Sequence, residues 1–331
     1  MTSFTDRKTV ESMVDNEVTV AITPNGLADA VIDGTFYLPH EEKMPIHQFF
    51  ELLDQEHPDT PSAVHYIQSQ NNNMRDGGDF TKLFAEVPDH IDFATEALGC
   101  LPDAVNFWCG SRHAVTSFHK DHYENIYVVI TGSKTFTLIP PSESWALEER
   151  TFLTSKYSPS KINDPSEPST TSTYAWKQEP LYIDPETCDI STDESSNYSR
   201  MMTRWCSLDP LREHDAAIFR QRIGYTKRRG LLLTVTLERG DVLYLPSLWA
   251  HKVEQGDKTM AVNYWYDMNF GKGYQLHQLL RSLAADAGYM ERDEEIPDNE
   301  GEEEEEEDEM DIRRRMFQEL GLGENAIMFT G

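Results

Sequence analysis

Residues 114–141, AVTSFHKDHYENIYVVITGSKTFTLIPP, contain the stretch that decides the fold. Alternating apolar residues over 126–130 indicate a β-strand, and Thr131-Gly132-Ser133 indicates a turn. A second alternating run through Phe136 and Leu138 ends at two prolines. The stretch predicts a β-hairpin, with histidine and acidic side chains at its entrance.

Three side chains in and beyond this stretch form a candidate metal site. His119 and Asp121 are two residues apart, so on an extended strand both point to the same face. Residues 229–268 predict three more strands, and His251 falls on the last but one. Two histidines and one carboxylate, with open positions remaining, are the ligand set of non-haem Fe(II) oxygenases. A lone strand histidine packed by Trp249 is the alternative for His251.

Two other His-x-Asp patterns occur and are weaker candidates. His57-Pro58-Asp59 contains a proline that breaks a regular strand, and His90-Ile91-Asp92 follows Pro88-Asp89, where helices commonly begin. We expect neither pattern to bind a metal.

Five stretches occur in an order and spacing that resemble one family: DAVNFWCG (103–110), TSFHKDHYEN (116–125), Gly132-Ser133-Lys134, YLPSLWAH (244–251) and AVNYWYDM (261–268). Residues 17–290 resemble the JmjC-domain oxygenases, and among them the small (3S)-lysyl hydroxylases of GTPases, for which peptidase activity on histone tails has also been proposed. The resemblance implies a mainly β fold, a double-stranded β-helix (a jelly-roll, cupin-like JmjC barrel) with flanking helices. It also implies Fe(II), 2-oxoglutarate as cosubstrate, and dioxygen.

The resemblance gives each matching residue a role. His119, Asp121 and His251 would bind the iron, and Lys134 would pair with the distal carboxylate of 2-oxoglutarate. Further cosubstrate contacts would come from Thr116, Asn125, Tyr127 and Asn263. Two alternatives stay open: Lys134 as a turn lysine facing water, and Asn263 in a hydrogen bond internal to the sheet.

The resemblance favours hydroxylation at C-3 of a lysine in a protein substrate, such as a GTPase or another basic segment. A histone-tail demethylase would use the same iron chemistry on an N-methyl group, and a peptidase would shorten the peptide instead. A non-catalytic acidic binding module is the third class. An oxygen gained on lysine, a lost methyl group, a shortened peptide or no turnover at all would separate them.

Composition and charge limit the partners, the cellular location and the cysteine chemistry that we expect. The chain has 331 residues and a net charge of −29, so we expect no binding to nucleic acid phosphates. There is no signal-peptide pattern and no apolar run of membrane-spanning length, and we expect a cytoplasmic or nuclear protein. The four cysteines lack metal-finger spacing and are too few for a disulfide framework.

Segments around the barrel are expected as follows. Residues 1–16 form a short leader, where the family usually has a longer segment; this difference bears on barrel completeness and dimerisation more than on iron binding. Residues 155–197, rich in Ser, Thr, Pro and Asp, form a flexible insert that Tyr174, Trp176 and Tyr182 pin locally. Residues 291–311 form a disordered acidic tail, a solvated segment or a contact for basic partners, and 312–331 a short C-terminal segment.

A leucine-rich segment, 274–290, predicts an amphipathic helix with Leu276, Leu279, Leu280 and Leu283 on one face. That face either packs on its own barrel or pairs with the same helix of a second copy, giving a homodimer.

Overall fold

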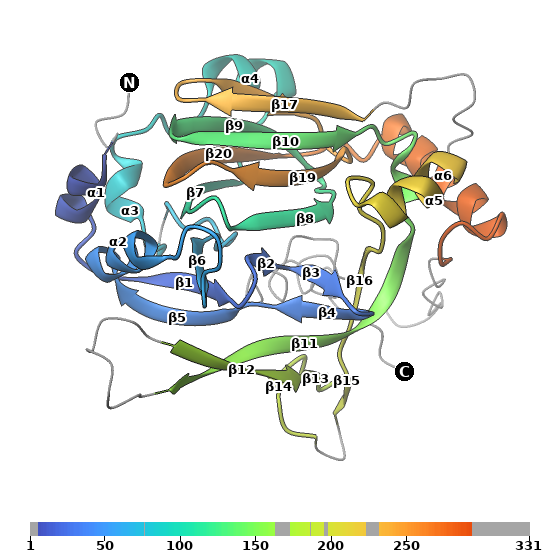
Figure 1. The fold of residues 1–331 in the computed structure, drawn as a ribbon. Helices are drawn as coiled ribbons and strands as arrows, with labels where there is room; N and C mark the ends of the chain where they lie inside the picture. The colour runs from blue at the N-terminus through green and yellow to red at the C-terminus, as the bar shows by residue number, and fades with distance from the viewer. Residues whose placement is uncertain are drawn as a thin grey trace.

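Two β-sheets facing each other form the centre of the molecule (Figure 1). The computed structural model describes residues 6–75, 77–162, 173–185, 187–194, 198–222 and 232–292. The first sheet has the order β18 (Val242–Leu245), β9 (Tyr123–Thr131), β20 (Thr259–Asp267), β7 (Ala104–Gly110), β6 (Val64–Ile67), β1 (Glu17–Thr23) and β5 (His40–Pro45). The second has the order β17 (Leu233–Glu238), β10 (Ser133–Ile139), β19 (Ala250–Gln255), β8 (Val115–His119) and β2 (Leu27–Ala28).

The facing sides of these sheets enclose one apolar core. Trp108, Tyr127 and Ala261 of the first sheet belong to the same buried cluster as Phe136 and Val253 of the second. Alternation along β20 sends Ala261, Asn263 and Trp265 into this interior and the intervening residues to the outside. The mainly β, cupin-like barrel predicted from the sequence is therefore confirmed.

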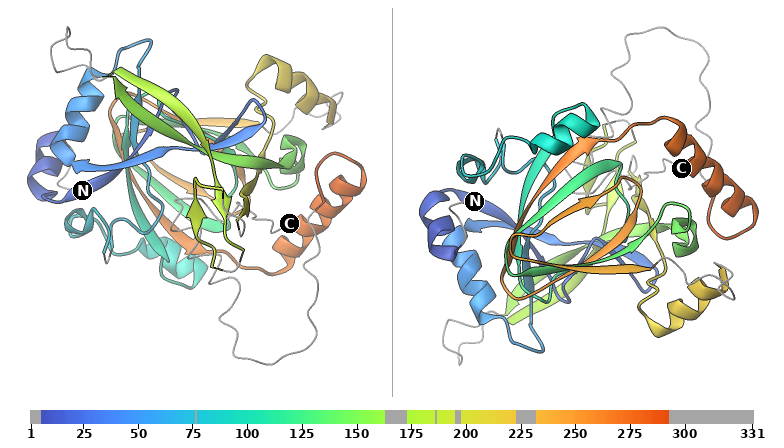
Figure 2. Two further views of the ribbon diagram at one scale, coloured as in Figure 1. Left: turned by 90° about the horizontal axis from the view of Figure 1, so that it is seen from below. Right: turned by 90° about the horizontal axis from the view of Figure 1, so that it is seen from above.

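Helices cover the outside of the first sheet (Figure 2). These are α1 (Arg7–Met13), α2 (Ile46–Gln55), α3 (Thr81–Phe84) and α4 (Asp92–Leu98). Val10 of α1, Phe49 of α2 and Leu83 of α3 are fully buried against outward residues of β1, β7 and β20. The expected leader, residues 1–16, thus contributes a helix to the core.

The predicted hairpin at residues 126–138 is wrong. β9 and β10 do not pair with each other, because β9 lies between β18 and β20, whereas β10 lies between β17 and β19. Gly132 carries the chain from one sheet to the other with φ +74°, and a Cβ there would lie 2.4 Å from Thr259 Oγ1. Alternation along both strands follows equally from a crossover between facing sheets, since both strands have one buried face.

Residues 229–268 contain four strands in the described part, not three, because Pro246 ends β18 before β19 begins. His251 nevertheless lies on the last strand but one, as predicted.

Within the segment 155–197, predicted to be a flexible insert, the described residues mostly form strands, and 163–172, 186 and 195–197 lie outside the described residues. A third sheet has the order β12 (Thr173–Pro180), β11 (Glu149–Ile162), β4 (Thr35–Leu38) and β3 (Ala30–Ile32), with β16 (Met202–Cys206) also paired to β11. A fourth small sheet joins β14 (Ile190–Ser191), β13 (Tyr182–Ile183) and β15 (Ser199–Arg200). Tyr174 and Trp176 pack against the main core, and the Tyr157 ring lies 5.9 Å from that of Trp176. Aromatic contacts therefore hold a polar sequence in regular structure.

The remaining helical elements lie at the end of the barrel opposite α1 to α3 (Figure 1). They are the short 3-10 helix η1 (Ser144–Leu147), α5 (Glu213–Arg222) and α6 (Lys272–Asp286). On α6 the buried residues are His277, Arg281 and Ala284, whereas Leu276, Leu279 and Leu283 are more than half exposed. The alternative in which the leucine face packs on its own barrel is therefore wrong for Leu276, Leu279 and Leu283.

Residues 293–311 of the predicted acidic tail and the segment 312–331 lie outside the described residues. No helix in the described ranges is long and apolar enough to cross a membrane.

Candidate iron and cosubstrate site

The predicted iron ligands meet at one end of the second sheet. His119 ends β8, Asp121 follows in the next loop, and His251 lies directly opposite His119 on β19. Asp121 oxygens lie 3.8 Å from His119 Nε2 and 3.6 Å from His251 Nε2. All three side chains are buried, and their ligand atoms lie within 4.8 Å of one another. One ion can therefore contact all three.

Hydrogen bonds hold both imidazoles in a ligand orientation. His119 Nδ1 lies 2.8 Å from the Ser117 carbonyl oxygen, and His251 Nδ1 lies 2.9 Å from that of Trp249. A carbonyl only accepts, so each Nδ1 carries the proton and each Nε2 presents a lone pair toward Asp121. Burial, reinforced by the neighbouring His119, lowers the pKa of His251 to about 4, so its imidazole is neutral. This donor set fits a divalent iron ion.

Trp205 of β16 contacts both His119 and Ser117, the residue that orients His119. Its ring stacks on His119 at 5.8 Å between centroids, and its Nε1 donates a hydrogen bond to Ser117 Oγ at 2.8 Å. Ser117 therefore orients His119 through its carbonyl oxygen and is itself held by Trp205 through its hydroxyl.

A β-bulge in β8 brings Thr116 to the same face as His119. Opposite them on β19, Val253 pairs with Thr116 and His251 with His119, so β8 has one residue more than β19 over this interval. On a regular strand Thr116 and His119, three residues apart, would point to opposite faces. The extra residue in the bulge places both side chains on the same face. Sequence alternation alone gave no sign of the bulge.

Lys134 lies on the inner face of β10 with an unbalanced charge. It is 1% exposed, and among the described residues its Nζ has one hydrogen-bond partner, the Tyr66 hydroxyl at 2.8 Å. Nζ also lies 5.1 to 5.9 Å from the ring centroids of Tyr66, Trp108 and Tyr127. Burial lowers the pKa of Lys134 to about 7. A buried ammonium with aromatic neighbours and no carboxylate fits the carboxylate of a bound cosubstrate. The alternative of a turn lysine facing water is excluded.

The other predicted cosubstrate residues line the same interior. Thr116 shares a hydrogen bond with Tyr66, and the Tyr127 ring packs edge-on against Phe136. The amide of Asn263 is paired at both ends: its Oδ1 accepts from Trp108 Nε1 at 2.8 Å, and its Nδ2 donates to Asn125 Oδ1 at 3.2 Å. The sheet-internal hydrogen bond, the alternative for Asn263, is therefore present. Cosubstrate contact by Thr116, Asn125, Tyr127 and Asn263 stays a prediction.

Sequence reasoning missed two residues beside Lys134. Tyr66 binds its ammonium, yet in the apolar strand VHYI it gave no signal other than that of a core aromatic. Gln255 pairs with Lys134 across β10 and β19, and both atoms of its buried amide lack a hydrogen-bond partner. A Cβ at Gly110 would lie 2.7 Å from the Gln255 amide nitrogen, so glycine leaves this side chain its space.

The histidines of the two weaker His-x-Asp patterns make local contacts. His57 Nδ1 accepts hydrogen bonds from the backbone of Asp59 and Thr60, which closes a turn, and His90 contacts Thr95. Within the described ranges, His119, Asp121 and His251 are the one group with metal-site geometry.

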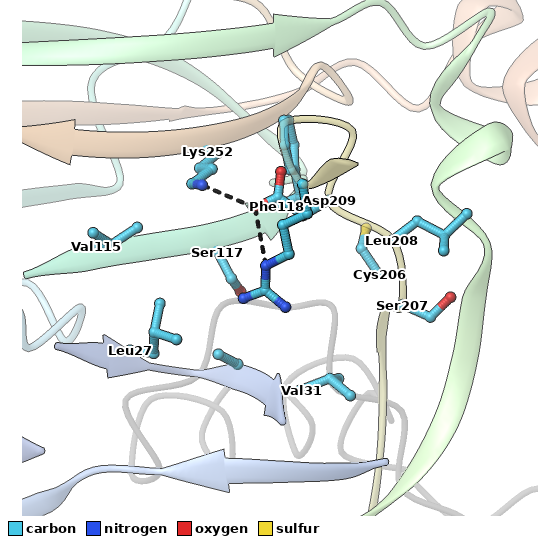
Figure 3. A pocket seen from close by; sticks show the side chains of 12 residues that line it. Leu27, Val31, Val115, Ser117, Phe118, Cys206, Ser207, Leu208, Asp209 and Lys252 are labelled. Carbon is cyan, nitrogen blue, oxygen red and sulfur yellow. Dashed lines mark hydrogen bonds and ion pairs between the residues drawn. The ribbon is translucent and has the colours of Figure 1, made fainter. Parts of the chain in front are cut away.

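A separate pocket lies on the other side of the ligand strands (Figure 3). It is lined by Ser117 and Phe118 of β8, Lys252 of β19 and residues of β2, β3 and the loop after β16. Its charges are balanced internally, because Lys252 lies 2.8 Å and Arg212 3.8 Å from Asp209. None of the three candidate iron ligands lines it.

Comparison with known proteins agrees with this geometry. A family described as "Cupin-like domain" matches residues 2–272. The human protein named "Bifunctional peptidase and (3S)-lysyl hydroxylase JMJD7" is 37% identical over 276 residues, which cover 82% of this chain and 74% of that protein. "Lysine-specific demethylase JMJ32" of Arabidopsis thaliana is 32% identical (82% and 72% covered), and "JmjC domain-containing protein E" of Dictyostelium discoideum is 33% identical (81% and 74%). With the barrel and the buried triad, these matches show that the chain belongs to the cupin-like family of JmjC-domain enzymes.

Proposed function

We propose that this protein is an Fe(II)- and 2-oxoglutarate-dependent hydroxylase that acts on a lysine of a protein substrate, at C-3. The observation that carries the proposal is the pairing, in one barrel, of the His119-Asp121-His251 triad with the unbalanced ammonium of Lys134. The name of the human relative, at 37% identity, supports lysine as the target.

The bound groups would supply the oxidising chemistry: dioxygen and 2-oxoglutarate yield succinate and carbon dioxide, and one oxygen atom enters a C–H bond of the substrate. His119, Asp121 and His251 would bind the metal on one side and leave its other positions open. Lys134, with Tyr66, would fix the distal carboxylate of 2-oxoglutarate, and Thr116, Asn125 and Tyr127 would orient it.

The apolar lining of the barrel has its own part in the reaction. Phe136, Leu138 and Val253 lie on the same inner face as Lys134 and His251 and place apolar side chains beside both. A dry interior strengthens the pairing between Lys134 and a carboxylate and limits side reactions. No acidic or basic side chain is required to move a proton.

The first test compares wild-type protein with His119→Ala in Fe(II)-dependent turnover of 2-oxoglutarate, with and without lysine-containing GTPase peptides. We expect peptide-stimulated succinate formation and a gain of one oxygen on lysine by mass spectrometry. The variant loses one of three ligands, so its turnover should fall by more than the roughly 10- to 100-fold that loss of an outer-shell partner costs.

His57→Ala is the matched control, because it changes a His-x-Asp pattern that closes an exposed turn. This variant should keep wild-type turnover. Well-folded wild-type protein without iron-dependent turnover would refute the hydroxylase and favour a binding module.

Demethylation is the second candidate, supported by the name of the Arabidopsis relative. The same assay on methylated histone-tail peptides separates it, since demethylation removes the mass of a methyl group whereas hydroxylation adds that of an oxygen. Peptidase activity, which the human relative's name includes, would appear as a shortened peptide.

A further inference from the structure

Asp29 is a buried carboxylate without a cation. It lies between β2 and β3, is 5% exposed, and its Oδ2 accepts one hydrogen bond, from Gln68 Nε2 at 3.1 Å. Its Oδ1 is buried and has no hydrogen-bond partner, and no described Lys, Arg or His lies within ion-pair distance. An unpaired buried charge is costly, so this side chain is either protonated or awaits a cation.

Hydrogen bonds connect Asp29 to β8 and to the segment after β6, each of which contacts the candidate site. Its carbonyl oxygen accepts a hydrogen bond from Ser117 Oγ at 2.7 Å, and the carbonyl of Ser117 in turn orients His119. Its carboxylate reaches Gln68, two residues beyond Tyr66, which holds Lys134. Leu27, Ala30 and Val31 line the separate pocket of Figure 3, whereas Asp29 does not. The carboxylate therefore lies outside that pocket, beside Gln68.

A second acidic side chain adds to the negative potential around Asp29. Glu41 and Tyr66 both lie opposite Ala21 in neighbouring strand pairs, so the two share one face of the first sheet. Burial, with a smaller contribution from the charge of Glu41, raises the pKa of Asp29 to about 7. A cation beside Asp29 would offset both the cost of burying the carboxylate and its repulsion by Glu41.

The backbone at Asp29 has a conformation that few residue types tolerate. Its φ is +53°, a left-handed conformation that asparagine and aspartate tolerate better than other residues except glycine. This conformation defines the turn between β2 and β3. It also means that asparagine can replace aspartate there without disturbing the backbone.

From these contacts we infer that Asp29 binds the ammonium group of the substrate lysine and so selects lysine for the iron centre. The inference rests on the proposed function. It accounts for two unbalanced charges at once: Lys134 has the sign that a cosubstrate carboxylate needs, and Asp29 has the sign that a lysine side chain needs. Because Gln68 occupies Oδ2, the free Oδ1 is the acceptor.

The test measures binding without turnover. Full-length protein with Zn(II), which does not undergo redox chemistry, is titrated with N-acetyl-L-lysine methylamide and with the norleucine analogue, which lacks only the ammonium group. NMR titration gives both dissociation constants. Wild-type protein should prefer the lysine probe at least tenfold, and Asp29→Asn should bring the preference close to one.

Asp33→Asn is the matched control, because Asp33 also has a left-handed backbone, with φ +49°, but is exposed in the next turn. This variant should keep the wild-type preference, and thermal unfolding checks that both variants fold. The inference is overturned if wild-type protein has no preference, if Asp29→Asn keeps it, or if Asp29→Asn weakens both probes equally, which would mark a structural role.

The outcomes also separate this inference from the proposed function. An active lysyl hydroxylase whose preference is independent of Asp29 contradicts the inference alone. A protein with an Asp29-dependent lysine preference but no 2-oxoglutarate turnover contradicts the proposed function alone.

Discussion

Lys134 shows how one residue can depend on the ligand that it is proposed to bind. Its buried ammonium has the Tyr66 hydroxyl as hydrogen-bond partner and no carboxylate among the described residues, and burial lowers its pKa to about 7. Unfolding returns this pKa to about 10.4. Between these pH values the unfolded chain binds the additional proton, so the contribution of Lys134 to the unfolding free energy rises with pH.

The affinity for 2-oxoglutarate should change in the opposite direction. Only the protonated lysine attracts a carboxylate, so we expect the dissociation constant to increase as the pH rises from about 7 toward 9. Lys134→Met should weaken binding by about 2 kcal/mol or more, roughly 30-fold, and remove this pH dependence. Calorimetric titration with 2-oxoglutarate over this pH range measures both effects.

Lys252→Met is the control for this prediction. Lys252 lies on the neighbouring strand β19 but pairs with Asp209 on the other side of it. The variant should keep the pH dependence, and a wild-type affinity that is flat across the range would show that Lys134 does not bind the cosubstrate.

The predictable residues of the site are those whose types are chemically restrictive. His119, Asp121 and His251 could be found before the fold was known, because their ligand set suits a metal and the stretches around them resemble one family. Tyr66 and Gln255 could not be found, because a tyrosine or glutamine within a strand is common in any β protein. Their importance comes from their proximity to Lys134, which only the folded barrel creates.

At the scale of elements, a buried ionic network joins the loop after β8, which carries the candidate ligand Asp121, to α6. Glu149, the first residue of β11, pairs with Lys120, which lies in sequence between the candidate ligands His119 and Asp121, and with Arg281 of α6. Arg204 of β16 lies 3.8 Å away. Although burial alone would raise it, these cations hold the pKa of Glu149 well below its usual range.

Removal of the Glu149 charge should therefore be strongly destabilising. Glu149→Gln leaves buried cations without their anion, and we expect a loss of about 3 to 5 kcal/mol in unfolding free energy by urea denaturation. Because the folded pKa is lowered, the wild-type stabilisation is present above the ordinary carboxyl range and is lost as the pH falls through and below it.

Glu254→Gln is the comparison, since this glutamate is half exposed and lies 3.7 Å from Lys252. Surface changes of this kind usually cost less than about 0.5 kcal/mol. Equal effects of the two substitutions would show that the network does not stabilise the fold.

Strand existence was easier to predict than strand pairing. Alternation located β9, β10, β19 and β20, but the same pattern is compatible with a hairpin and with a crossover between facing sheets. The β8 bulge and the strands at residues 149–180 depended on contacts with β19 and with aromatic residues distant in sequence. Local composition therefore suggested flexibility where tertiary packing produces order.

At the scale of the whole molecule, α6 is turned so that its polar residues are inside and its leucines outside. Arg281 binds Glu149 and His277 is buried, which leaves Leu276, Leu279 and Leu283 exposed along one stripe. An apolar stripe of this kind on a soluble surface marks an interaction site. We propose that it pairs with the same stripe of a second copy in a two-fold dimer, as the sequence suggested.

Charge placed in this stripe should separate the copies. In a two-fold interface each substitution acts twice, so Leu279→Glu with Leu283→Glu should convert a dimer into a monomer by light scattering coupled to size-exclusion chromatography. Gln278→Glu, on the exposed surface of the same helix, should leave the dimer intact because residues 278 and 279 do not share a helix face. The leucines are not part of the Glu149 network, so the monomeric variant should still be a folded barrel. Its unfolding should differ from that of the wild-type dimer only in no longer depending on protein concentration. A wild-type protein that is monomeric at all accessible concentrations would show that the stripe has another partner.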